Sequence, residues 1–208
     1  KKKYILYSIR MGIKDLTAFL KEYAPGTISK GNLSQLKQSI YGENPPNRKL
    51  RAAIDTSLFL YKYKYRSGDN FINEFMEQIN RLMVNNIQPI YVFDGPPTSD
   101  KQDTINSRKE RKQNMVAKIN DIESKLNNTD EPLTEEQTDN LKKELVKIKR
   151  KSIFITSEDI GRLVYFLDIM NIPHVKRNME ADLVCSRLSQ LGIVDVVISE
   201  DMDHLTSG

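Results

Sequence analysis

Residues 89–94 read Pro-Ile-Tyr-Val-Phe-Asp, an apolar run that ends in an acid. The length of this run and its β-branched and aromatic residues predict a buried strand. Two further runs have the same form: residues 50–54 lead directly into Asp55, and residues 194–198 lead within three residues into Asp201. Because all three runs are short and largely apolar, they predict strands of a parallel sheet.

Amphipathic helical patterns separate these runs, so strands and helices alternate along the chain. We expect Asp69 to cap one of the helices, and Thr156 or Ser157 to cap another. The alternation predicts an α/β protein with a parallel-sheet core that is covered by helices on both faces. The expected helices cover residues 13–24, 56–64, 69–86, 157–170 and 180–191, and charge-rich helical patterns cover residues 101–128 and 133–151.

The composition indicates one folded domain with a polar surface. The length of 208 residues predicts a single domain with an insertion, and residues 98–152 are the segment that does not resemble a core. One cysteine excludes a disulfide framework and a cysteine-based zinc site, and it fits a reducing compartment. No apolar stretch is long enough to span a bilayer. The net charge of +4 slightly favours a polyanionic partner.

Acidic residues follow the predicted strands, so we expect them to lie together at the edge where the carboxyl ends of parallel strands meet. A parallel α/β sheet binds its ligand at this edge. Close carboxylates raise one another's pKa values, so such a cluster is tolerated chiefly when divalent cations neutralise it. Oxygen ligands without His or Cys suit Mg²⁺ or Mn²⁺. Two such ions about 4 Å apart serve the attack of water on a phosphodiester. The predicted metal ligands are Asp55, Asp94, Glu180, Asp182, Asp201 and Asp203.

Each acid also has a purely structural interpretation. Asp94-Gly95 is an ordinary turn dipeptide, and Asp182 in the first turn of a helix suits the helix dipole. For a single residue the two interpretations are about equally probable. Three acids after strands, together with two acid-x-acid pairs, favour a metal site for the whole set.

The predicted insertion carries basic residues in its first helix. Lys101 and Arg108 are seven residues apart and therefore share a helical face, with Arg111 and Lys112 one turn further on. Cations that stand beside the acidic edge would hold a phosphate there and offset charge in the transition state. A charge-rich helix is more often a solvated surface, but the position directly after Asp94 favours the phosphate-binding interpretation.

Five segments in order along the chain resemble the motifs of the flap endonuclease (XPG-type) 5′-nucleases. The resemblance covers residues 11–208, and it implies the PIN-like 5′-nuclease fold with residues 98–152 as a helical arch. The matching segments are Met11-Gly12-Ile13-Lys14-Asp15-Leu16, Ala53-Ile54-Asp55-Thr56-Ser57, Tyr91-Val92-Phe93-Asp94-Gly95, Glu180-Ala181-Asp182 and Glu200-Asp201-Met202-Asp203-His204-Leu205-Thr206.

The resemblance implies a Mg²⁺-dependent hydrolase, with two ions, that cuts DNA near single-strand/double-strand junctions in replication and repair. It gives the six acids the role of metal ligands, and Lys101 and Arg108 that of contacts to the scissile phosphate. Tyr61 would stack on a base, and Gly12 would lie near the junction-binding surface. Arg111 and Lys112 would add DNA contacts.

The resemblance also implies partners and a location. The substrate would be DNA with a 5′ flap or junction, the protein would be a monomer without a membrane segment, and a sliding clamp would bind a C-terminal tail that lies outside this chain. The protein would be nuclear, or cytoplasmic if viral. Residues 1–10 would be an extension, and residues 11–208 a nuclease domain that is incomplete at its C-terminus. Two alternatives stay open: a non-catalytic DNA-junction scaffold of the same fold, and an RNA-directed nuclease.

Overall fold

The structure, a computed structural model, describes residues 16–96, 102–127, 134–151 and 153–201. The chain divides into two compact units. A sheet unit combines residues 1–96 with residues 156–208, and a hairpin unit comprises residues 97–155. The predicted insertion, residues 98–152, falls within the hairpin unit.

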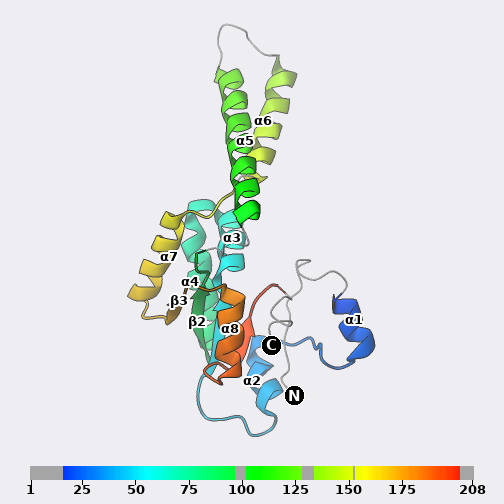
Figure 1. The fold of residues 1–208 in the computed structure, drawn as a ribbon, viewed down its shortest axis with the longest axis vertical. Coiled ribbons are helices and arrows are strands. Elements are labelled where there is room, and N and C mark those ends of the chain that lie inside the picture. Colours follow the sequence, from blue (N-terminus) through cyan, green and yellow to red (C-terminus); the bar gives the residue numbers. More distant parts are fainter. Residues whose placement is uncertain (1–15, 97–101, 128–133, 152, 202–208) are drawn as a thin grey trace. The chain divides into compact units, whose positions relative to one another are not determined.

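Four parallel strands form the sheet of the first unit, in the order β3-β2-β1-β4 (Figure 1). The strands predicted from the apolar runs are present, and the parallel α/β class is confirmed. Strand β3 was not predicted from the sequence. The strands are β1 (Leu50–Asp55), β2 (Ile87–Phe93), β3 (His174–Lys176) and β4 (Val196–Ile198).

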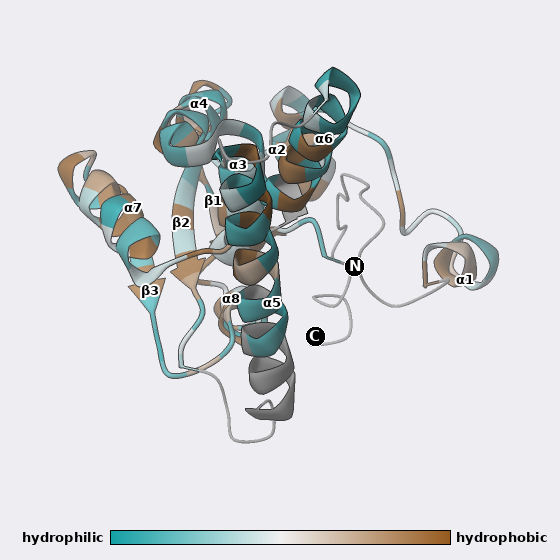
Figure 2. Cartoon of the chain, turned by 90° about the horizontal axis from the view of Figure 1, so that it is seen from above, coloured by the Kyte–Doolittle hydropathy of each residue, from teal (hydrophilic) through white to brown (hydrophobic). Residues whose placement is uncertain are grey.

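Neighbouring residues of β2 face opposite sides of the sheet, since side chains alternate along a strand. On one side, the ring of Tyr91 lies 5.7 Å from that of Phe75 in α4 (Phe71–Val84). On the other side, Val92 belongs to a buried cluster with Ala53 and with Val184 of α8 (Ala181–Gln190). Figure 2 shows α4 and α8 on opposite sides of β1 and β2. Both faces of the sheet are therefore covered by helices, as predicted.

The other helices predicted for the sheet unit are present, and one of their expected caps differs. A capping box joins Thr156 and Asp159, so Thr156 begins α7 as predicted. Asp69 does not cap α4: it lies in a short 3-10 helix, η1, and its side chain pairs with Lys64 instead. The helices are α1 (Leu16–Tyr23), α2 (Leu33–Tyr41), α3 (Thr56–Ser67), η1 (Gly68–Asn70) and α7 (Ser157–Ile169).

The hairpin unit consists of two long helices, α5 (Gln102–Asn127) and α6 (Glu135–Lys151). The side chain of Ile122 in α5 is buried, and Lys149 Nζ of α6 lies 2.6 Å from Glu123 Oε1 of α5. The ion pair thus joins the two helices next to the buried Ile122. In the described residues, no helix combines the length and the apolar character needed to cross a membrane.

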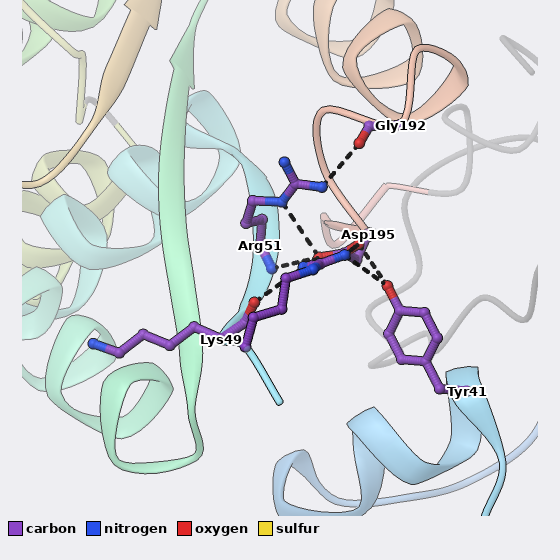
Figure 3. A network of polar contacts seen from close by, with 6 residues as sticks. Tyr41, Lys49, Arg51, Gly192 and Asp195 are labelled. Carbon is purple, nitrogen blue, oxygen red and sulfur yellow. Dashed lines mark hydrogen bonds and ion pairs between the residues drawn. The ribbon is translucent and has the colours of Figure 1, made fainter. Parts of the chain in front are cut away.

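A polar network around Asp195 fixes the amino end of the sheet (Figure 3). The Asp195 carboxylate accepts hydrogen bonds from Arg48 Nη1 (2.6 Å), from the Tyr41 hydroxyl (2.6 Å) and from the backbone N–H of Arg51 (2.8 Å). Burial favours a raised pKa for Asp195, but the hydrogen bonds from Arg48, Tyr41 and Arg51 outweigh it and hold this pKa well below its usual range. The network ties the end of α2 and the start of β1 to the turn before β4.

We expect Asp195→Asn to lower the free energy of unfolding by about 2 kcal/mol at pH 7, since charge-assisted hydrogen bonds are lost. Urea denaturation measures the change. Asp168→Asn is the matched control, because the Asp168 side chain is 62% exposed and surface substitutions change stability by at most about 0.5 kcal/mol.

The difference between the parent and Asp195→Asn depends on pH. The folded pKa of Asp195 lies below its unfolded value of about 3.9, so the carboxylate stabilises the fold at every pH above that value. Its contribution is lost as the pH falls through this value toward the folded pKa. The stabilities of parent and variant should therefore converge in acid, and a constant difference from neutral pH into the acid range would contradict the assignment.

Candidate acidic site

Asp55 is the last residue of β1 and the N-cap of α3. Its side chain accepts a hydrogen bond from the backbone N–H of Ser57 (3.2 Å). The residue is only 7% exposed. One short segment thus ends a strand, begins a helix and places a carboxylate at the carboxyl end of the sheet.

Asp94 directly follows β2, and the strand register aligns Asp55 of β1 with Val92 of β2. Both oxygens of the Asp94 carboxylate are used: Oδ1 accepts the backbone N–H of Ala181 (2.8 Å), and Oδ2 accepts the hydroxyl hydrogen of Ser57. Asp94 therefore connects the first turn of α3 with the first turn of α8, which cover opposite faces of the sheet.

Gly95 brings the segment before α8 into contact with the end of β2. Its backbone N–H donates to the carbonyl of Met179 (2.8 Å). A Cβ atom at this position would lie 2.3 Å from the carbonyl oxygen of Arg177 and 2.6 Å from the nitrogen of Met179. Glycine is needed here because two backbones approach closely. In the sequence Asp94-Gly95 looks like an ordinary turn, so only the structure reveals this contact.

Glu180 and Asp182 stand at the start of α8, as N-cap and in the first turn. Beneath them lies Cys185, which is fully buried. Burial raises the pKa of the Cys185 thiol, and the negative charges of Asp55, Asp182 and Asp94 raise it further. The charges of these three predicted acids thus all act on one buried thiol.

Two acids directly after β4 lie within the described residues, Glu200 and Asp201. The backbone N–H of Asp201 donates a hydrogen bond to Ser199 Oγ (3.0 Å). Glu200 forms an ion pair with Lys62 of α3, so this acid is held against a helix. The sequence shows two adjacent acids and does not reveal which of them pairs with α3. Asp203 lies outside the described residues.

The predicted DNA-contacting residues belong to different parts of the chain. Tyr61 of α3 is 47% exposed, so it is available for stacking and is not part of the core. Arg108, Arg111 and Lys112 lie in α5, and the Arg111 side chain is exposed. Gly12 and Lys101 lie outside the described residues. The roles of all these residues stay predictions.

The donor set of the site consists of carboxylate oxygens, which is the chemistry that Mg²⁺ and Mn²⁺ prefer. Among the described side chains, no group of three or more His, Cys, Asp or Glu residues is close enough to hold a metal ion. The chemistry of the donors at this edge therefore fits a hard divalent cation, while a closed ligand cage is not formed by the described residues alone.

The fold and the acidic edge define a parallel α/β protein with carboxylates at the carboxyl ends of its strands. The XPG N-terminal domain matches residues 11–115, which is half of the chain, and the XPG I-region matches residues 171–208. The chain therefore belongs to the flap endonuclease/XPG-type nuclease family, as the motifs predicted.

Curated relatives agree with this assignment. Flap endonuclease 1 of Entamoeba dispar is 28% identical over 212 residues, which cover 95% of this chain and 50% of the relative. Flap endonuclease 1 of Cryptosporidium parvum is 30% identical over 213 residues, which cover 95% of this chain and 38% of the relative. The chain thus spans half or less of the length of these relatives.

A solved structure has a similar fold. The catalytic core of Rad2 in complex with a DNA substrate is 25% identical and superimposes with a TM-score of 0.50. The similarity covers 76% of this chain and 42% of that chain. It supports the PIN-like 5′-nuclease fold expected from the sequence.

Gly95→Ala tests the close approach between β2 and the segment before α8. We expect the free energy of unfolding to fall by about 2–4 kcal/mol, because backbone atoms must move to admit a methyl group. Gly161→Ala is the matched control. Gly161 lies inside α7, where a Cβ atom meets nothing within 4 Å, so alanine should raise stability by about 0.5–1 kcal/mol. Equal effects of the two substitutions in chemical denaturation would contradict the interpretation.

Proposed function

We propose that the protein is a structure-specific 5′ nuclease that hydrolyses DNA phosphodiester bonds at single-strand/double-strand junctions with the help of two Mg²⁺ ions. The observation that carries the proposal is the position of Asp94. Its carboxylate joins α3 and α8 beyond the carboxyl end of β2, and its charge acts with those of Asp55 and Asp182 on the buried Cys185 thiol. Membership in the flap endonuclease/XPG-type family supports the same activity.

Electrostatic magnitudes favour a bound cation at this edge. Two carboxylates about 5 Å apart repel each other by about 3 kcal/mol at an effective dielectric constant of about 20. The amino ends of α3 and α8 offset part of this, but a helix terminus contributes only about 0.3–1 kcal/mol per charge. The six proposed metal ligands, once gathered at this edge, would therefore require further positive charge. Divalent cations supply it, and Mn²⁺ would substitute for Mg²⁺.

The proposed roles follow the positions of the residues. The acids that would hold the metal ions are Asp55, Asp94, Glu180, Asp182, Asp201 and Asp203. When bound, the ions would supply a polarised water and stabilise charge on the phosphate. Lys101 and Arg108 of the hairpin unit would hold the scissile phosphate in line. Tyr61 would stack on an unpaired base next to the cut, with Gly12, Arg111 and Lys112 as further contacts to the DNA.

The proposed substrate is DNA with a 5′ flap or junction. The DNA substrate bound by the Rad2 core supports DNA as the ligand, and the names of the curated relatives support a flap. We further propose that the protein acts as a monomer in the nucleus, or in the cytoplasm if it is viral. A sliding clamp would be its partner during replication and repair.

Asp201→Asn tests the metal-site proposal. We expect cleavage of a flap substrate to fall by at least about 100-fold, since losing a metal ligand removes several kcal/mol of transition-state stabilisation. Binding of the substrate, measured by fluorescence anisotropy in Ca²⁺, should stay within about twofold, because phosphate contacts provide most of the affinity. Asp168→Asn, at an exposed residue of α7, controls for the loss of one negative charge. Cleavage by Asp201→Asn at the parent rate would overturn the proposal.

Calorimetric titration with Mn²⁺ tests the same site without any cleavage. The parent should take up Mn²⁺, and Asp94→Asn should bind it at least about tenfold more weakly, because a charged ligand is lost. Absence of Mn²⁺ uptake by the parent would indicate a junction scaffold of the same fold instead of a nuclease. Matched RNA and DNA flaps then distinguish an RNA-directed enzyme.

Arg108→Ala tests the proposed contact to the scissile phosphate. We expect the single-turnover cleavage rate to fall by about 10²-fold, the usual effect of removing one charge-stabilising donor, while the dissociation constant of the flap substrate rises much less. Lys125→Ala is the control, since Lys125 is an exposed residue of α5 that pairs with Asp121. A loss of affinity with an unchanged cleavage rate would make Arg108 a surface charge.

A further inference from the structure

Ser57 contacts two of the predicted metal ligands with two different groups. Its backbone N–H donates a hydrogen bond to Asp55 Oδ1 (3.2 Å), and its hydroxyl donates one to Asp94 Oδ2. Asp55 is the last residue of β1, whereas Asp94 directly follows β2. One residue in the first turn of α3 therefore connects acids that belong to two neighbouring strands.

The hydroxyl of Ser57 does not bond to the groups that are nearest in sequence. Ser and Thr hydroxyls in the first turn of a helix usually bond to backbone groups a few residues away. The neighbouring Thr56 does so, since its hydroxyl lies 3.5 Å from the carbonyl oxygen of Ile54. The acceptor of the Ser57 hydroxyl, Asp94, lies 37 residues further along the chain. A local helix-capping role therefore does not account for the Ser57 side chain.

The Asp94 carboxylate is held from both faces of the sheet. Oδ2 accepts the Ser57 hydroxyl, and Oδ1 accepts the backbone N–H of Ala181 in α8 (2.8 Å). The terminal torsion of an aspartate is soft, so one hydrogen bond leaves the carboxylate free to turn, whereas bonds on both oxygens fix its plane. Each carboxylate oxygen has about two lone-pair sites. The bonds to Ser57 and Ala181 thus orient Asp94 and leave it able to bind a cation.

Hydrogen bonds of this kind matter most for residues that bind metal ions. The partners that hold a metal ligand orient it, and their loss typically weakens metal binding by about 10–100-fold. A carboxylate that is already fixed also loses less freedom when a cation binds. Of the two groups that hold Asp94, the N–H of Ala181 belongs to the backbone. The Ser57 hydroxyl is the one that a side chain supplies.

We propose that Ser57 is a positioning residue: its hydroxyl fixes the plane of the Asp94 carboxylate while its backbone N–H holds Asp55, so that the two acids keep one relative position. All the groups involved belong to the sheet unit. The use of this position for a divalent cation and for catalysis rests on the proposed nuclease function. The inference requires no contact of Ser57 with the cation or with DNA.

Amide hydrogen exchange, measured by NMR without metal, tests the positioning role directly. Ser57→Ala removes the hydroxyl and keeps every backbone group. Because Asp94 can then turn away from α8, the N–H of Ala181 should exchange at least about fivefold faster. The N–H of Val184, which donates to the carbonyl of Glu180 at the start of the same helix (3.2 Å), should exchange at its parent rate.

Two further variants separate positioning from a general loss of stability. Ser57→Thr keeps the hydroxyl and should restore slow exchange at Ala181. Ser34→Ala removes a hydroxyl at the equivalent position of α2, where it donates to Asn32 (2.9 Å), and should leave exchange at Ala181 unchanged. If Ser57→Ala does not fold, Ser57→Cys replaces it, because a thiol is only a weak donor. Unchanged exchange at Ala181 in the folded variant, or equally faster exchange at Ala181 and Val184, would overturn the proposal.

Calorimetric titration with Mn²⁺ tests whether the fixed geometry serves a cation. We expect Ser57→Ala to bind Mn²⁺ about tenfold more weakly than the parent. In the Asp94→Ala background, which lacks the carboxylate that Ser57 holds, the same substitution should weaken binding by at most about twofold, because the effects of coupled residues do not add. An equal loss in both backgrounds would show that Ser57 does not act through Asp94 and would overturn the positioning role.

Cleavage kinetics separate this inference from the nuclease proposal. For Ser57→Ala, kcat should fall by about five- to twentyfold while KM stays within about twofold, because misplacement of a catalytic group affects the transition state more than substrate binding. A rise in KM by the same factor would indicate a role in substrate binding and overturn the positioning role. If the parent neither takes up Mn²⁺ nor cleaves a flap, the nuclease proposal fails, and amide exchange at Ala181 still decides the inference about Ser57.

Discussion

The hydrogen bonds of the Asp94 carboxylate are the constraint on which the candidate site depends. One oxygen receives the backbone N–H of Ala181 and the other receives the Ser57 hydroxyl, so the amino ends of two helices from opposite faces of the sheet converge on one acid. The partial positive charges of both helix ends then point toward the edge where acids gather. This arrangement offsets part of the negative charge of Asp94 without neutralising it fully.

Much of the fold could be predicted from the sequence because burial leaves a clear pattern. Strands β1 and β2 are apolar along most of their length, as expected for strands covered on both faces. Strand β3 left no such pattern: it has three residues, His174, Val175 and Lys176, and lies at the edge of the sheet. A segment with a single apolar residue looks like a loop in the sequence. The strand is recognised only from its pairing with β2.

The error at Asp69 has a local physical cause. An aspartate before an apolar helical pattern is a good N-cap candidate, and the sequence offers no reason to reject it. In the structure Lys64, one turn before the end of α3, attracts this carboxylate, and the residues between form a 3-10 turn. The Asp69 side chain therefore forms an ion pair across the short connection and does not cap α4. Helix α4 begins without a side-chain cap.

For the site, the sequence predicted the acids and not the groups that hold them. That Asp55 and Asp94 lie on adjacent strands follows from the parallel sheet alone, since the carboxyl ends of such strands meet at one edge. The roles of Ser57 and Gly95 depend on distances between segments that are more than thirty residues apart in the sequence. Ser and Gly are common in turns for local reasons, so their types carry no signal of a long-range contact.

Helix α3 shows how one element serves two neighbours without conflict. Lys62 and Lys64 are two residues apart, and a helix turns by about 100° per residue, so their side chains leave α3 on roughly opposite sides. Lys62 reaches Glu200, beside the predicted ligand Asp201, whereas Lys64 reaches Asp159 at the start of α7. Because Asp55 caps the same helix, a shift of α3 would move the end of β4, the start of α7 and the first acid of the site together. These two ion pairs and the Asp55 cap therefore connect α3 with the residue after β4, with the start of α7 and with the end of β1.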